Sequence, residues 1–126
     1  MEKRNKIIYW IATALLCFGM LGSGTAQILR QPDMVKLVTA LGYPDYFLPI
    51  IGVWKILAVI AILLPGYKLL KEWAYAGLFF VMTGALISHL AMGDGIAELV
   101  GPIMQSIFII LSWYFRPSGR RIISIN

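Results

Sequence analysis

Seven polar side chains lie within or beside long apolar stretches of this chain, where polar groups are costly. They are Ser23, Gln27, Arg30, Lys55, His89, Glu98 and Gln105. Together they provide hydrogen-bond donors, neutral acceptors and one carboxylate. Such a set could hold the polar head of a small molecule that carries carbonyl or hydroxyl groups.

The same residues do not have the spacing of a catalytic or metal centre. His89 is the only histidine, so the chain alone cannot supply two histidine ligands to a haem. Cys17 is the only cysteine, and no cluster of His, Cys and carboxylate residues has the spacing of a metal site. No pair of nucleophile and base is evident. The sequence therefore predicts no catalytic residue and no metal ligand, and it favours a binding protein over an enzyme.

The elements that position these residues are four apolar stretches. They cover residues 7–29, 46–64, 73–92 and 96–115. About 20 apolar residues in a helix cross the ~30 Å hydrocarbon layer of a bilayer. The mean hydropathy is +0.80 and only 13% of residues are charged, against about a quarter in soluble proteins. We expect an all-α fold, a four-transmembrane-helix bundle in which residues 1–126 form one integral membrane domain.

The basic residues are distributed unevenly between the two sides of this bundle. One side carries eight of the eleven: Lys3, Arg4, Lys6, Lys68, Lys71, Arg116, Arg120 and Arg121. The other side has Arg30 and Lys36 among several carboxylates. The positive-inside rule then places both termini in the cytoplasm. The net charge of +5 is thus a topology signal and not evidence of nucleic-acid binding.

The connection at residues 31–44 has room for further structure. It begins with Pro32 and Asp33 and continues with apolar residues at helical spacing, then ends at Gly42 and Pro44. This pattern predicts a capped, short amphipathic helix between spans one and two, lying at the outer interface over the bundle.

The depth of each polar residue indicates where the site lies. Lys55 is close to the centre of its span, where a lysine costs about 2.5–3.5 kcal/mol on insertion scales, so it should face the interior. Its side chain tilts toward the outer face, whereas Gln27 and His89 tilt inward from shallower positions. We therefore expect one polar pocket in the outer half of the bundle. Around Leu15, Leu63, Phe79 and Ile110 we expect no comparable group, which argues against an ion channel.

Structural explanations remain open for the same residues. Lys55 and Glu98 could form a buried ion pair that fixes helix register. His89 could be an interior histidine that is merely hydrogen-bonded, and Asp94 could cap the last span. Small residues on the same helix faces should allow close packing; these are Gly19, Gly22, Gly52, Gly77, Gly84 and Gly101.

Several short motifs between about Lys6 and Asp94 are similar to those of a known family. They are Leu41-Gly42-Tyr43-Pro44, Ile51-Gly52-Val53-Trp54-Lys55-Ile56-Leu57, Pro65-Gly66, Glu72-Trp73-Ala74-Tyr75-Ala76-Gly77, Gly84-Ala85, Ser88-His89 and Gly93-Asp94. In combination they resemble the DoxX-like family of small bacterial membrane proteins. The resemblance implies a four-helix membrane bundle in a bacterial inner membrane. It also implies an association with quinone-linked redox enzymes or, in more distant members, with receptor assembly and cargo transport.

Three hypotheses for function follow. The first is a non-catalytic binding or accessory subunit whose outer pocket holds a small amphipathic ligand, with a quinone as the candidate, or docks a membrane partner. The second is a quinone-linked oxidoreductase subunit in which His89 or Glu98 relays protons. The third is an assembly chaperone or structural protein in which polar groups only orient helices. A redox enzyme, another membrane protein or a second copy of the chain could be the partner.

Overall fold

The computed structural model describes residues 2–120 and is all-α over that range. Its helices are α1 (Glu2–Ile28), α2 (Pro32–Ala40), α3 (Phe47–Leu63), α4 (Lys68–Ala91), α5 (Ile96–Tyr114) and the 3₁₀ helix η1 (Ser118–Arg120). No strand occurs among these residues. The all-α prediction is confirmed. Arg121, counted above among the basic residues, lies outside the described residues.

Three of the four predicted spans have the length and composition to cross a membrane. They are the helices α1, α4 and α5. The second predicted span corresponds to α3, which is apolar but has 17 residues. At about 1.5 Å per residue it is about 25 Å long, a few ångströms short of a typical hydrocarbon layer.

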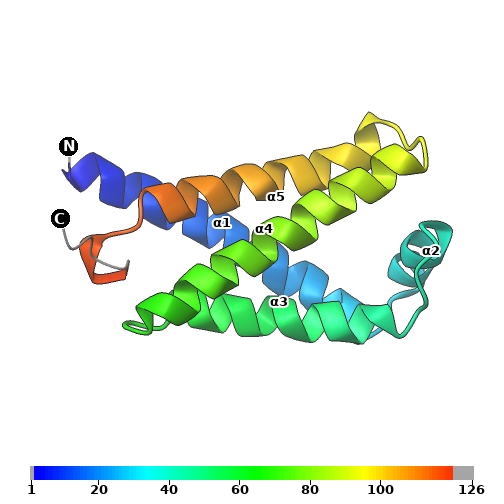
Figure 1. Cartoon of the computed structure of the whole chain (residues 1–126), viewed down its shortest axis with the longest axis horizontal. Helices are drawn as coiled ribbons and strands as arrows, with labels where there is room; N and C mark the ends of the chain where they lie inside the picture. Colours follow the sequence, from blue (N-terminus) through cyan, green and yellow to red (C-terminus); the bar gives the residue numbers. More distant parts are fainter. Residues whose placement is uncertain (1, 121–126) are drawn as a thin grey trace.

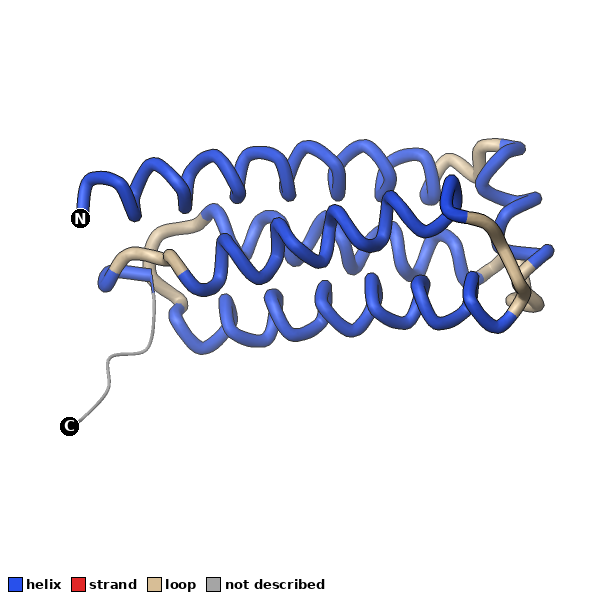
Figure 2. Tube along the Cα trace, turned by 90° about the horizontal axis from the view of Figure 1, so that it is seen from above, coloured by secondary structure: helices blue, strands red, loops and turns tan. Residues whose placement is uncertain are grey.

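The long helices pack side by side as an antiparallel bundle (Figures 1 and 2). The start of α1, the α3–α4 connection and the end of α5 lie at one end, which we name the basic end for its lysines and arginines. The opposite end holds α2 and the α4–α5 connection (Figure 1). A buried apolar core, which includes Leu16, Met20, Ile62, Leu78 and Ile109, joins the four long helices.

Two helix boundaries differ from the sequence prediction. The predicted short helix is present as α2, and Gly42 ends it with a φ of 94°, a conformation that glycine adopts at little cost. Its N-cap residue is Gln31, however, and no side chain caps it. The other difference is α4, which begins at Lys68 and not near Trp73. One further turn of helix therefore brings Lys71 and Glu72 into the bundle.

Helices α1 and α3 contact each other through their backbones at two glycines. A Cβ atom added to Gly52 would lie 2.6 Å from the carbonyl oxygen of Gly24 and 2.8 Å from Ile28 Cγ1. The sequence prediction named Gly52 for packing but missed Gly24. It was wrong for Gly22, Gly77, Gly84 and Gly101, where an added Cβ meets no atom within 4 Å. Close helix packing thus depends on a few glycines and not on the whole set.

We expect Gly52→Ala to lower the free energy of unfolding by about 1–3 kcal/mol, because the new methyl group meets backbone that cannot move aside. Thermal unfolding of the purified protein in detergent would measure this. Gly22→Ala, in open space, is the control and should be neutral or slightly stabilising. Equal stability of the two variants would contradict the packing account.

Candidate functional site

A cavity of about 420 Å³ lies between the long helices near the α2 end of the bundle. Six of the seven polar residues named from the sequence line it: Ser23 and Gln27 from α1, Lys55 from α3, His89 from α4, and Glu98 and Gln105 from α5. Arg30 does not line it. That residue follows α1 with a φ of 53° and is exposed. We name this space the Lys55 cavity.

Lys55 is almost completely buried yet has few partners. Its side chain comes from the middle of α3, and the residue is 4% exposed. Its Nζ donates one hydrogen bond, to Ser23 Oγ at 3.2 Å. Among residues 2–120 it forms no ion pair, so the alternative of a Lys55–Glu98 salt bridge is wrong for this structure. An ammonium group has three donors, so two remain available to an acceptor in the cavity.

His89 is held in the cavity wall by Asp94. The two lie at the end of α4 and in the connection after it, and His89 Nδ1 is 2.6 Å from Asp94 Oδ2. A carboxylate accepts, so Nδ1 carries the hydrogen and Nε2 is the ring atom left for a ligand. Asp94 was expected to cap the last helix. The N-cap of α5 is instead Gly95, without a side-chain bond.

Two glutamines place polar oxygens in the same region. Gln27 Oε1 and Gln105 Oε1 are buried and have no hydrogen-bond partner within the described chain. The side chain of Gln105 packs directly on Gly19, where an added Cβ would lie 1.9 Å from Nε2. Pro102, inside α5, also lines the cavity. Buried acceptors without partners are uncommon in proteins, and they favour a donor from a bound molecule.

Helix α2 covers the outer side of this region. Met34 and Leu37 of α2 line the Lys55 cavity. A second cavity of about 230 Å³ lies beneath Leu37, Val38 and Leu41, and it too is lined by Lys55 and His89. The loop after α2 is tied down because Tyr43 Oη is 2.8 Å from Ser88 Oγ and the Tyr43 ring stacks on Phe47.

One known protein family matches most of this chain. The profile of the DoxX-like family matches residues 11–115, which include α3, α4, α5, the part of α1 from Ile11 onward and all the residues that line the cavity. The chain belongs to the DoxX-like family. No curated protein matches it, and neither does any solved structure. The sequence resemblance ended near Asp94, whereas the family match continues through α5 and so includes Glu98 and Gln105.

The basic end of this DoxX-like membrane protein also holds polar contacts, contrary to the sequence prediction. Ser112 Oγ lies 2.6 Å from Thr13 Oγ1 and 2.7 Å from Tyr75 Oη, in a buried network that joins α1, α4 and α5. The prediction of an inner half without comparable groups was therefore wrong. These hydroxyls satisfy one another, which favours a structural role for them.

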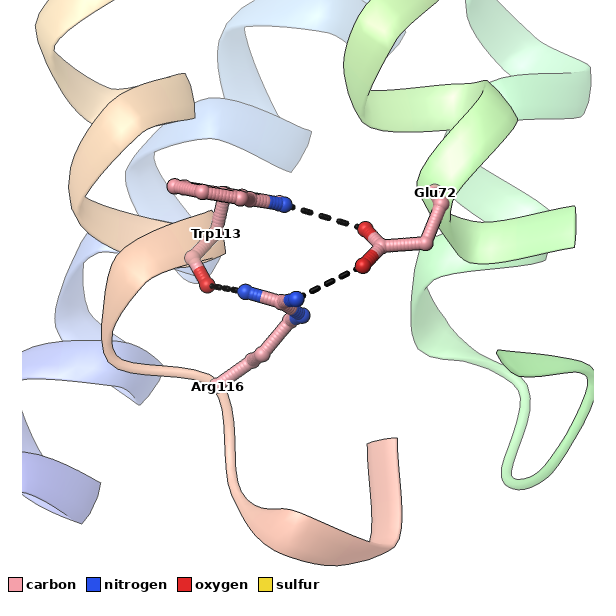
Figure 3. Close-up of polar contacts among 3 residues, drawn as sticks. All are labelled: Glu72, Trp113 and Arg116. Atoms are coloured by element: carbon pink, nitrogen blue, oxygen red, sulfur yellow. Dashed lines mark hydrogen bonds and ion pairs between the residues drawn. The ribbon is translucent and has the colours of Figure 1, made fainter. Parts of the chain in front are cut away.

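A second polar group ties α4 to the end of α5 (Figure 3). Glu72 accepts hydrogen bonds from Arg116 Nη2 at 2.6 Å and from Trp113 Nε1 at 3.0 Å. The Arg116 guanidinium also lies 4.6 Å from the centre of the Trp113 ring and donates to the Trp113 carbonyl. Glu72 therefore joins the start of α4 to the end of α5.

Lys71 is a second buried lysine, but each of its three hydrogen-bond donors has an acceptor. It is 1% exposed, and its Nζ donates to the carbonyl oxygens of Ala61 at 2.6 Å, Ile62 at 3.2 Å and Leu64. Arg120 donates to Ile62 as well, at 2.9 Å. These carbonyls lie at the C-terminal end of α3, where they lack helical partners and where positive charge is favourable.

We expect the two buried lysines to respond oppositely to replacement by Met. Lys55→Met should leave the free energy of unfolding unchanged or raise it by up to about 2 kcal/mol, because it removes a costly charge and one hydrogen bond. Lys71→Met should lower it by about 2–3 kcal/mol, because several carbonyls at the end of α3 lose a donor. Unfolding in mixed micelles would measure both. Equal destabilisation would contradict the assignment of different roles.

Proposed function

We propose that this DoxX-like protein binds a small amphipathic molecule and holds its polar head in the Lys55 cavity. In this proposal the protein is a non-catalytic binding or accessory subunit. The best candidate for the ligand is a quinone. The sections of the cavity wall that would contact the head come from α1, α3, α4 and α5, with α2 as the cover.

The observation that supports this proposal best is that Lys55 is buried with a single hydrogen-bond partner. An ammonium group buried without a carboxylate partner is costly, and a structural role would require more contacts than one serine hydroxyl. The comparison with Lys71, which donates to several backbone carbonyls, makes the difference plain. A ligand acceptor against Lys55 would offset the cost of burying the charge.

The other groups define the chemistry of that ligand. Lys55 and the Gln27 and Gln105 amides can donate to a carbonyl oxygen, whereas Glu98 and the two glutamine oxygens can accept from a hydroxyl. A quinone carbonyl accepts and a quinol hydroxyl donates, so both forms find partners. The cavity volume of about 420 Å³ lies within the range usual for small-molecule sites.

A quinone-linked oxidoreductase subunit is the second candidate, and the His89–Asp94 pair is the observation that favours it. The His89 side chain is 5% exposed and the Asp94 side chain is 32% exposed, so the pair extends from a buried ring in the cavity wall to a carboxylate that water reaches. It could carry protons from a bound quinol. The electrons would have to pass to a redox partner protein. An assembly chaperone, or a structural role within a homo-oligomer, is the third candidate.

We further propose that α3 crosses the membrane together with α1, α4 and α5, and that the basic end faces the cytoplasm of a bacterial inner membrane. Among the described residues, the basic end carries Lys3, Arg4, Lys6, Lys68, Lys71, Arg116 and Arg120. The α2 end has Asp33, Asp45, Asp94 and Glu98. This asymmetry agrees with the positive-inside rule.

Reporter fusions test this topology. A reporter at either terminus should be active in the cytoplasm, and one inserted after Gly42 or after Asp94 should be active outside it. Termini on opposite sides of the membrane would mean that one of the long helices does not cross it, and would refute the four-span arrangement.

The binding proposal predicts that Lys55→Met abolishes quinone binding while the bundle stays folded. Titration of the protein in lipid nanodiscs with decyl-ubiquinone, followed by intrinsic fluorescence, would measure the affinity. We expect a loss of at least about tenfold, since a hydrogen bond from a charged group contributes about 1.5–3 kcal/mol. Arg30→Asn is the matched control. It removes a positive charge that does not line the cavity and should bind as wild type does.

Substitutions of His89 separate the first two candidate functions. His89→Gln keeps one donor and one acceptor, so a hydrogen-bonding role predicts substantial binding by His89→Gln and none by His89→Phe. Proton transfer requires the imidazole itself, so loss of quinone turnover in both variants, measured with the redox partner, would favour the oxidoreductase.

For the Lys55→Met variant of the binding test, a quinone affinity equal to that of wild type would refute the ligand site.

A further inference from the structure

An apolar groove on the lipid-facing side of the bundle runs between α3 and α4. Its volume is about 590 Å³, and small residues form its floor: Ala58 and Ala61 from α3, and Ala74 and Gly77 from α4. Trp54 and Trp73 flank it and are exposed at 59% and 66%. A Cβ added to Gly77 meets nothing within 4 Å, so the floor there is open.

Among the described residues that line the groove, Lys55 is the charged one, and it also borders the polar site. The same side chain lines the groove, the Lys55 cavity and the smaller cavity beneath α2. From Val81, at the level of Lys55, the groove follows α4 to Leu70 toward the basic end. At about 1.5 Å per residue that distance is about 16 Å, the scale of an extended hydrocarbon chain.

We propose that this groove holds the hydrocarbon tail of the same molecule whose head occupies the Lys55 cavity, and that the molecule enters sideways from the bilayer. This inference rests on the proposed function. It adds that the ligand is a membrane lipid with a long single chain, such as a prenylated quinone, and is not a water-soluble molecule that arrives from the α2 end. Lys55 marks the boundary between head and tail.

Tail length alone would not test this proposal. A tail that moves from lipid into an apolar groove exchanges one apolar environment for another, so it gains little from the hydrophobic effect. Longer tails also concentrate any ligand in the bilayer. The informative measurement is the change that a groove-filling substitution causes for a tailed ligand relative to a tail-less one.

Gly77→Leu places a side chain in the groove at a position where an added Cβ meets no atom within 4 Å, and the residue does not line the Lys55 cavity. We expect this variant to bind decyl-ubiquinone about tenfold more weakly than wild type in nanodiscs, because a tail attached to a head beside Lys55 has to pass along the groove and would collide with the new leucine. Its affinity for the same ring without the decyl chain should be unchanged. Gly22→Leu, at an exposed glycine of α1 with equally open space, should change neither affinity.

Each outcome decides the proposal. Selective weakening of the tailed ligand by Gly77→Leu supports it. It is overturned if Gly77→Leu affects neither ligand or both equally, or if Gly22→Leu weakens the tailed ligand to the same extent. If wild type binds neither ligand, the proposed function fails and the groove assignment fails with it, a result distinct from tail-independent binding.

Discussion

The close contact of α1 with α3 at Gly24 and Gly52 is the constraint on which the polar site depends. The carbonyl oxygen of Gly24 lies where a side chain on Gly52 would have to be. Lys55 is one helical turn from Gly52, and Ser23 is adjacent to Gly24, so the same contact brings the buried ammonium group against its single hydroxyl partner. A larger residue at Gly52 would collide with this backbone and so strain the contact that sets the position of Lys55.

Two buried lysines show how position decides the role of the same side chain. Lys71 neutralises the end of α3, where carbonyls without helical partners attract a cation, and it is assisted there by Arg120. Lys55 lies in the middle of the same helix, where the carbonyls are already bonded within the helix, so its donors can be used only by groups on other helices or by a ligand. The contrast is the physical basis for assigning stability to the first lysine and binding to the second.

The sequence predicted the helical elements well because apolar length and turn residues determine them locally. Six of the seven polar residues named from the sequence line one cavity, since position along a span gives depth and spacing gives the helix face, but the prediction was wrong for Arg30. It could not predict pairing between helices. Asp94 was given a capping role although it holds His89, and the Thr13–Ser112–Tyr75 network was missed because isolated hydroxyls in an apolar stretch carry no periodic signal. Lys71 was assigned to a loop because α4 extends one turn further than its apolar stretch.

The central claim is that Lys55 is buried in order to hold a ligand and not to support the fold. Native mass spectrometry of the protein, extracted from its own membrane in nanodiscs, tests it directly. Wild type should carry a bound small amphipathic molecule of defined mass, and Lys55→Met, folded and in the same membrane, should lack it while Arg30→Asn retains it. The same bound mass in wild type and Lys55→Met, or no bound molecule in either, would contradict the account.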